Sequence, residues 1–255
     1  MPMIRIVLCG ALGRVGRVVA AEVEKESDLE LAGAVEAAGV EGSIAGISVT
    51  SSLQSVIDTC DVIVDFTNPD AALEHIAAGA DAGLPVIVGT TGFSPEQLER
   101  ARRAAERTPL LIAPNMSAGV NLMFRTVEDM ARALPDFDPE IIEIHHNRKK
   151  DSPSGTAARL ADAIERARAG LRRVHGREGM LGARKDNELG IHSLRGGDVV
   201  GEHTVVFAGE GERLEITHRA HSRRTFARGA IRAVRFIAGK PAGLYSMADV
   251  LGLTG

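Results

Sequence analysis

The chain has 255 residues, of which 44% are hydrophobic and 25% are charged, which excludes a disordered or fibrous protein. Lys and Arg number 30 against 34 Asp and Glu, and the net charge of −4 with only 3% aromatic residues argues against nucleic-acid binding. Both cysteines lie in apolar runs, and no apolar stretch is long enough to span a membrane. We therefore expect a cytoplasmic protein of two domains.

Short apolar runs alternate with helical patterns in the first part of the chain. Strands are expected at 3–9, 29–35, 62–66, 85–88 and 110–113, and helices at 14–25, 70–82 and 94–107. Strands separated by helices form parallel β/α/β units with right-handed crossovers. The sequence therefore predicts an α/β fold whose residues 1–114 form a doubly wound, Rossmann-type dinucleotide-binding domain.

The pattern changes after residue 114. Helices are expected at 119–134, 154–168 and 227–239, strands at 139–146, 199–208 and 213–217, and a mobile surface loop at 170–188. A Gly-Glu-Gly turn joins the last two strands, as is typical of a hairpin. These features predict an α+β domain with a mixed sheet over 115–225. The pattern does not place the C-terminal segment of about 226–255, and its packing back on the first domain is left open.

The first predicted strand ends in the glycine-rich turn Gly10-Ala11-Leu12-Gly13-Arg14-Val15-Gly16, which opens a helix. Glycines in this position let the backbone approach a pyrophosphate at a helix N-terminus. The spacing is G-x-x-G-x-x-G, so a turn that only packs helix against strand is the alternative. Glu36 follows the second strand, where an acidic side chain can bind the ribose of NAD. Ala37 offers no cation for the 2′-phosphate of NADP, although Arg14 could reach one.

Three more segments end strands of the first domain: Asp65-Phe66-Thr67, Gly89-Thr90-Thr91-Gly92-Phe93 and Ala113-Pro114-Asn115-Met116-Ser117. Ligands of open parallel sheets bind outside the carboxyl ends of the strands. Ordinary turns between strand and helix are the alternative interpretation of these segments. Together with the glycine-rich turn, they predict a dinucleotide site along this edge.

The segment 143–156, EIHHNRKKDSPSGT, is the densest polar cluster in the chain. His145 and His146 are adjacent on a predicted strand and point to opposite faces, so at least one is expected to face a site. Lys149 adds positive charge, and the helix that begins at 154–156 offers N–H groups to an anion. A surface charge run and a plain helix cap are the alternatives. No three-ligand spacing supports a metal site.

In this order, the segments resemble the dihydrodipicolinate reductase family, also called 4-hydroxy-tetrahydrodipicolinate reductase. The most specific match is E-x-H-H-x-x-K-x-D-x-P-S-G-T-A, which begins at Glu143. Arg195-Gly196-Gly197-Asp198 and Gly201-Glu202-His203-Thr204 also match, so the resemblance spans nearly the whole chain. It implies reduction of 4-hydroxy-tetrahydrodipicolinate to tetrahydrodipicolinate with NADH or NADPH, in the diaminopimelate route to lysine.

The resemblance also implies roles for individual residues. His145 is the expected general acid/base and Lys149 the proton donor, while His146, Gly155 and Thr156 are expected to bind the dicarboxylate substrate. The implied cofactor-binding residues are Gly10, Ala11, Leu12, Gly13, Arg14, Val15, Glu36, Gly89, Thr90, Thr91, Ala113, Pro114, Asn115 and Met116. The family resemblance further implies a homotetramer.

Two other classes of protein share parts of this pattern. A different two-domain dehydrogenase, such as a homoserine or aspartate dehydrogenase, would act on an amino or hydroxy acid and not on the imine. A non-catalytic NAD-sensing regulator would need a DNA-binding helix pair or a basic face, and the sequence shows neither clearly. Ala37 stands where family members that prefer NADPH often carry a basic residue, which leaves the cofactor preference open.

Overall fold

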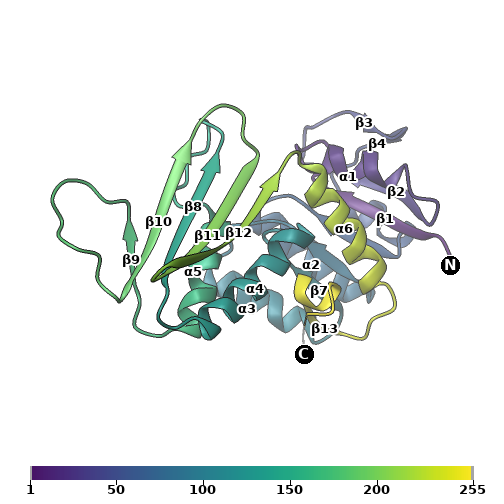
Figure 1. The fold of residues 1–255 in the computed structure, drawn as a ribbon. Helices are drawn as coiled ribbons and strands as arrows, with labels where there is room; N and C mark the ends of the chain where they lie inside the picture. The colour runs from purple at the N-terminus through teal and green to yellow at the C-terminus, as the bar shows by residue number, and fades with distance from the viewer. Residues whose placement is uncertain (1, 254–255) are drawn as a thin grey trace. The chain divides into compact units, whose positions relative to one another are not determined.

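The computed structural model describes residues 2–253. The chain divides into two compact units, of which the first runs to Ala118 and resumes at Arg223, while the second comprises Gly119–Ser222. Figure 1 labels most of the helices and strands of both units. Within the described residues, every helix is too short or too polar to cross a bilayer.

The first unit is built on a six-stranded sheet with the strand order β13-β7-β6-β5-β1-β2, and all its pairings are parallel. Its strands are β1 (Ile4–Cys9), β2 (Leu29–Val35), β5 (Val62–Asp65), β6 (Val86–Val88), β7 (Pro109–Ile112) and β13 (Gly243–Tyr245). Its helices are α1 (Gly16–Val23), α2 (Pro69–Ala82), α3 (Pro95–Ala105), α6 (Arg224–Ile237) and α7 (Met247–Val250). A small hairpin of β3 (Ser43–Ile44) and β4 (Ile47–Ser48) follows β2. The predicted doubly wound fold is confirmed.

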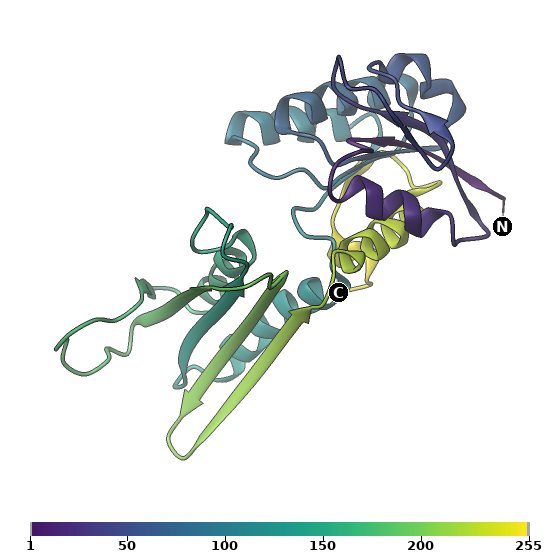
Figure 2. The ribbon, with the colours of Figure 1, turned by 90° about the horizontal axis from the view of Figure 1, so that it is seen from above.

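Helices cover both faces of this sheet, as Figure 2 shows. On one face, buried residues of α1 and α6 pack against Leu8 and Val64; on the other, α2 and α3 pack against Val7 and Ile63. The central strands are therefore apolar on both sides, as is usual in parallel sheets. Polar side chains that could bind a ligand therefore lie at the ends of the central strands.

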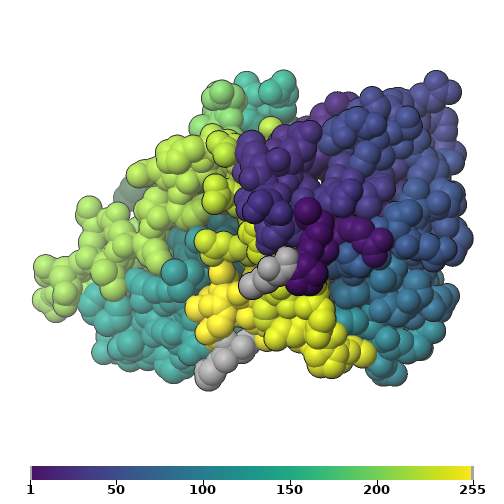
Figure 3. Space-filling view, turned by 90° about the vertical axis from the view of Figure 1, so that its right-hand side faces the viewer, coloured from purple at the N-terminus to yellow at the C-terminus, as the bar shows by residue number. Residues whose placement is uncertain are grey.

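The C-terminal segment belongs to the first unit. Strand β13 extends the sheet beside β7, and α6 packs against α1, so the yellow and purple parts of the chain touch in Figure 3. The Arg224 Nε donates a hydrogen bond of 2.9 Å to Glu22 on α1. Gly229 permits a close approach, because a Cβ there would lie 1.7 Å from the carbonyl oxygen of Met116. Helix α6 thereby supports the 113–116 segment.

The second unit is a mixed five-stranded sheet with the order β12-β11-β8-β10-β9. Its strands are β8 (Asp138–His145), β9 (Arg172–His175), β10 (Glu188–Arg195), β11 (Gly201–Gly209) and β12 (Glu212–Ala220). Strand β10 runs parallel to β8 and β9, whereas β11 runs antiparallel to β8 and β12. Helices α4 (Ala118–Ala133) and α5 (Gly155–Ala167) share one apolar core with the sheet. The predicted mixed sheet is confirmed.

Two strands of this sheet escaped the sequence prediction. The predicted loop at 170–188 contains β9, and no strand was predicted at 188–195, where β10 lies between β8 and β9. Glycine in the middle of β10 weakens its apolar pattern. That glycine has a packing reason, because a Cβ at Gly190 would lie 1.7 Å from the Glu140 Oε2 atom.

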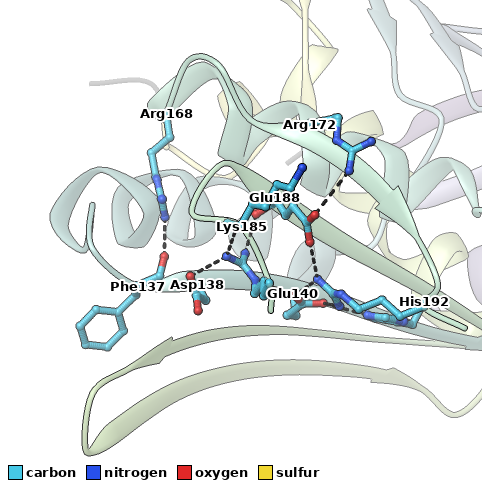
Figure 4. A network of polar contacts seen from close by, with 10 residues as sticks. Phe137, Asp138, Glu140, Arg168, Arg172, Lys185, Glu188 and His192 are labelled. Carbon is cyan, nitrogen blue, oxygen red and sulfur yellow. Dashed lines mark hydrogen bonds and ion pairs between the residues drawn. The ribbon is translucent and has the colours of Figure 1, made fainter. Parts of the chain in front are cut away.

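The Glu140 carboxylate holds the segment that joins β9 to β10, as Figure 4 shows. It accepts hydrogen bonds from Arg177 at 2.8 Å, from Arg184 at 3.1 Å and from His192 at 2.8 Å. Burial opposes ionisation of this carboxyl, but the hydrogen bonds from Arg177 and His192 outweigh it and lower the pKa of Glu140 to about 2. Two arginines of the 170–188 segment are thus held by one charged group.

Candidate active site

The glycine-rich turn after β1 is packed so closely that its glycines leave no room for side chains. Gly10 has a φ of 75°, and a Cβ there would lie 2.7 Å from the Phe66 carbonyl oxygen. A Cβ at Gly16 would lie 2.1 Å from the Gly10 carbonyl oxygen. The turn therefore presents bare backbone just ahead of α1, where the helix dipole favours an anion. This cradle fits the pyrophosphate of a dinucleotide.

Glu36 lies directly after β2, beside this turn. Its Oε1 atom accepts a hydrogen bond of 2.5 Å from the amide of Leu12. The structure thus brings together the two features that the sequence placed 24 residues apart. A carboxylate at this strand end can accept hydrogen bonds from ribose hydroxyls, and the neighbouring Ala37 carries no charge.

The other predicted cofactor residues lie at the ends of β6 and β7. Thr90 is buried, and its hydroxyl donates a hydrogen bond of 2.8 Å to Asp65 at the end of β5. Thr91 is exposed, and Gly89 lies against the Phe66 ring, where a Cβ would come within 2.1 Å of Cε1. Because neighbouring parallel strands end at the same edge, these residues share the edge with the glycine-rich turn.

The segment that follows β7 is partly buried. Ala113 and Met116 are buried, whereas Pro114 is exposed. The side chain of Asn115 accepts a hydrogen bond of 2.9 Å from the amide of Ser117, which fixes the bend of the backbone. Because residues 113–117 carry no charged side chain, this segment would contact a ligand at the edge of the sheet mainly through its backbone groups.

Cys9, Asp65 and His75 form a cluster in which one potential metal ligand from each lies within 4.8 Å of the others. The Asp65 carboxylate already accepts hydrogen bonds from His75 at 2.6 Å and from neighbouring threonines. Burial, and then the charge of Asp65, raises the pKa of the Cys9 thiol, which opposes the thiolate that a metal needs. The arrangement favours a hydrogen-bonded carboxylate, and the expected lack of a metal site stays a prediction.

In the second unit, Glu143 and His145 occupy alternate positions of β8 and therefore share its buried face. The His145 Nδ1 atom lies 2.5 Å from Glu143 Oε2. A carboxylate accepts a hydrogen, so Nδ1 carries it and Nε2 is the ring nitrogen left for other chemistry. Gly201 lies next to the Nε2 atom, and a Cβ at that position would come within 3.0 Å of it. The glycine therefore avoids crowding of Nε2 by a side chain.

Arg195 completes the arrangement from β10, directly opposite His145 in the strand register. Its guanidinium donates two hydrogen bonds to the Glu143 carboxylate, at 2.9 and 2.8 Å, and a third to the Asp151 carbonyl at 2.8 Å. Burial of Glu143 opposes its charge, but the hydrogen bonds from His145 and Arg195 outweigh burial and hold the pKa of Glu143 well below its usual range. Glu143 therefore stays ionised and fixes the His145 ring.

Ser154 joins this group to the start of α5. Its amide donates to Glu143 at 3.2 Å, and its hydroxyl accepts from the Ala157 amide at 3.1 Å as the helix cap. The same hydroxyl lies 3.0 Å from the Nε2 atom of His203. Gly155 follows with open space where a Cβ would stand. The predicted substrate residues Gly155 and Thr156 thus begin a helix capped next to Glu143 and His203.

Lys149 and His146 lie in the turn that leaves β8. The Lys149 amide donates to the His146 carbonyl at 3.1 Å, and the His146 amide donates to the Val199 carbonyl at 2.7 Å. The Lys149 ammonium lies 2.8 Å from the Asp151 carboxylate. Asp151 is well exposed, so its side chain can move away and leave the ammonium to another anion.

Sequence reasoning assigned no role to Arg195 or His203, although both lie within matched motifs. A contact between Glu143 and His145 could have been predicted from the sequence, because residues two apart on a strand share a face. Arg195 carried no such signal, since its contact depends on the pairing of β10 with β8. His203 reaches the group through β11, which pairs with the other edge of β8.

His203 predicts a pH dependence of stability. Burial, and next the charge of His145, lowers the pKa of His203 to about 3 from its unfolded value of 6.5. Between pH 3 and pH 6.5 the unfolded chain therefore binds more protons at this histidine than the folded chain does. The contribution of neutral, buried His203 to the free energy of unfolding is complete above pH 6.5 and is lost as the pH falls. At pH 4 we expect the free energy of unfolding to be about 3 kcal/mol lower than at pH 7 because of this residue.

Urea unfolding of wild type and His203→Gln from pH 4 to pH 7.5 measures this contribution. We expect a shallower pH dependence in the variant, while His175→Gln, which alters an exposed histidine on β9, keeps the wild-type slope. Equal slopes in wild type and His203→Gln would contradict the prediction.

Comparison with known proteins places the chain in a family. Residues 4–116 match the family model described as "Dihydrodipicolinate reductase, N-terminus", and residues 119–251 match the one described as "Dihydrodipicolinate reductase, C-terminus". The 4-hydroxy-tetrahydrodipicolinate reductase of Syntrophobacter fumaroxidans is 47% identical over 98% of this chain and 100% of that protein. The protein of the same name from Methanothermobacter thermautotrophicus is 46% identical over 98% of this chain and 100% of its own length.

Solved structures agree with this assignment. A dipicolinate-bound dihydrodipicolinate reductase from Paenisporosarcina sp. TG-14 is 28% identical and superposes with a TM-score of 0.82, covering 97% of this chain and 98% of that one. GenD2 of gentamicin A biosynthesis, solved with NAD, is 14% identical with a TM-score of 0.65, over 99% of this chain and 91% of its own, and shares the fold alone. The family models together cover nearly the whole chain, and the chain belongs to the dihydrodipicolinate reductase family.

Proposed function

We propose that the chain reduces 4-hydroxy-tetrahydrodipicolinate to tetrahydrodipicolinate with NADH or NADPH, in the diaminopimelate route to lysine. The observation that carries the proposal is the buried Glu143–His145 pair, held by Arg195 beside the start of α5. A proton-transferring group and an anion-binding helix terminus suit a dicarboxylate imine. A cytoplasmic location and a homotetramer complete the proposal.

The first unit would hold the cofactor. The bare backbone at Gly10, Gly13 and Gly16 would face the pyrophosphate, and Glu36 would accept hydrogen bonds from the adenosine ribose. The remaining proposed contacts are Ala11, Leu12, Arg14, Val15, Gly89, Thr90, Thr91, Ala113, Pro114, Asn115 and Met116. The nicotinamide supplies a hydride when it is bound.

His145 would act as general acid/base through its Nε2 atom. Its Nδ1 atom is committed to Glu143, which fixes the ring tautomer and the orientation of Nε2. The reaction replaces the 4-hydroxyl by hydrogen: the hydroxyl leaves with one proton as water, and the hydride is added to the same carbon. Lys149 would donate that proton, while His145 would take a proton from the adjacent carbon and return it there, so that one proton is consumed overall. The present partner of Lys149, Asp151, is exposed and exchangeable.

The substrate carboxylates would bind to His146, Gly155 and Thr156. Gly155 and Thr156 open α5, whose dipole favours an anion at its N-terminus. The absence of a side chain at Gly155 leaves space next to the backbone there. Ser154 keeps this helix start in place through its bond to Glu143.

A coupled assay tests the proposed function and the choice of cofactor together. Purified dihydrodipicolinate synthase supplies the substrate, and loss of NADH or NADPH absorbance is followed at the same concentrations of both. We expect turnover with both cofactors and kcat/KM for NADH at least equal to that for NADPH, because Glu36 repels a 2′-phosphate and Ala37 adds no cation. Activity on amino or hydroxy acids, with none on the imine, would instead indicate a different dehydrogenase.

A further inference from the structure

Asp65 is a buried acidic residue that the mechanism above does not use. It is the last residue of β5, the strand between β1 and β6 in the middle of the sheet. Its side chain is fully buried, and its only ion-pair partner among residues 2–253 is His75. A buried carboxylate without a permanent cation is costly unless hydrogen bonds satisfy its oxygens.

Four donors satisfy this carboxylate. Oδ1 accepts from the Thr67 amide at 3.0 Å, from the Thr67 hydroxyl at 2.9 Å and from the Thr90 hydroxyl at 2.8 Å. Oδ2 lies 2.6 Å from His75 Nδ1 and 3.0 Å from the Thr67 hydroxyl. The donors come from the turn after β5, the turn after β6 and helix α2. One carboxylate therefore connects three segments.

The two turns are also joined through their backbones. The Gly89 amide donates to the Asp65 carbonyl at 2.8 Å, and the Phe66 amide donates to the Cys9 carbonyl at 3.0 Å. The Phe66 ring covers Gly89, and the Phe66 carbonyl borders Gly10 in the glycine-rich turn. A displacement of Asp65 and its hydrogen-bonded partners would consequently move the backbone of the turn after β6 and of the glycine-rich turn after β1.

We propose that Asp65 is a positioning residue for the cofactor site, where it fixes the 89–91 turn through the Thr90 hydroxyl and the 65–67 turn through Thr67. The inference rests on the proposed function, because it takes these turns as part of the NAD(P)H site. Thr90 is buried and gives its single hydroxyl hydrogen to Asp65, so its side chain places the turn and its proposed contact with the cofactor is left to its backbone. The Asp65–Thr90 bond is charge-assisted and hence stronger than a neutral one.

The experiment measures NADH affinity of the free enzyme by calorimetry, without substrate or turnover. Thr90→Val removes the hydroxyl at nearly constant volume and is expected to weaken NADH binding about 10-fold or more, the scale of one lost hydrogen bond to a charged group. Thr90→Ser restores the donor and should bind as wild type does. Asp65→Asn should weaken binding at least as much as Thr90→Val.

Asp61→Asn is the matched control, since Asp61 precedes the other end of β5 and pairs with exposed Arg5. It should leave NADH affinity unchanged. Hydrogen exchange of peptides over 66–68 and 89–92 should rise in Thr90→Val and stay at the wild-type rate in Asp61→Asn. If Asp65→Asn does not fold, Thr90→Val tests the same bond.

Wild-type NADH affinity in Thr90→Val, or equal weakening in Asp61→Asn, would overturn the inference. A wild-type protein that binds neither NADH nor NADPH would overturn both the inference and the proposed function. A wild-type protein that binds NADH but does not reduce the imine would fail the proposed function only, and the Thr90 comparison would still decide the role of Asp65.

Discussion

Replacing His145 with glutamine is expected to lower kcat by about 10²–10⁴-fold, the usual effect of removing a positioned proton donor. Glutamine can still donate a hydrogen bond to Glu143, so the buried carboxylate keeps a partner while the titratable ring is lost. The fall should therefore appear in kcat with little change in the unfolding midpoint. Steady-state kinetics and urea unfolding of the same preparation separate the two effects.

Lys149→Ala should produce a fall of the same order in kcat and should also raise the KM for the dicarboxylate, because the substrate loses a cation. His175→Gln serves as the control for histidine replacement, since this side chain is exposed on β9. Turnover near the wild-type value in both His145→Gln and Lys149→Ala would rule out the proposed catalytic roles.

Replacing Arg195 with alanine is expected to destabilise the protein by about 3–5 kcal/mol, the scale for breaking a buried ion pair. Glu143 is fully buried, and among residues 2–253 it would keep His145, the Ser154 amide and the Ser193 side chain as partners, none of which carries a permanent charge. Without the guanidinium, the pKa of Glu143 should rise from its lowered value. Since Glu143 fixes the His145 ring, kcat should also fall by about 10²-fold through misplacement.

Arg195→Lys distinguishes charge from geometry. Lysine keeps the positive charge but cannot bridge both carboxylate oxygens, so we expect partial recovery of stability and poor recovery of kcat. Arg213→Ala is the matched control, because Arg213 pairs with Glu215 at an exposed site on β12, where an ion pair contributes about 0–1 kcal/mol. Urea unfolding and the pH profile of kcat/KM for the four proteins provide the measurements. A stability loss in Arg195→Ala no larger than in Arg213→Ala would refute the prediction.

Local patterns determined the class of fold. Apolar runs broken by helical periodicity predicted strands at 3–9, 29–35 and 62–66, because parallel strands buried on both faces leave a continuous apolar signal. The structure has these strands at Ile4–Cys9, Leu29–Val35 and Val62–Asp65. The turn at Gly10–Gly16 and the 143–156 segment were recognised because each combines unusual residues within a short stretch. These features depend on neighbours in the sequence, so the sequence alone carries them.

Contacts between distant segments were decided only by the tertiary structure. Strand β10 was missed because Gly190 interrupts its pattern, and the glycine is needed for packing against Glu140 of β8. The partnership of Arg195 with Glu143 follows from that pairing, across 52 residues of sequence. Helix α6 was predicted as a helix, but its place beside α1 depends on its apolar face finding a complementary surface. The sequence by itself determined most of the elements, though not β9 and β10, and the chemistry-bearing motifs. The tertiary structure decided which of their side chains meet, because long-range pairing depends on three-dimensional packing that no local pattern records.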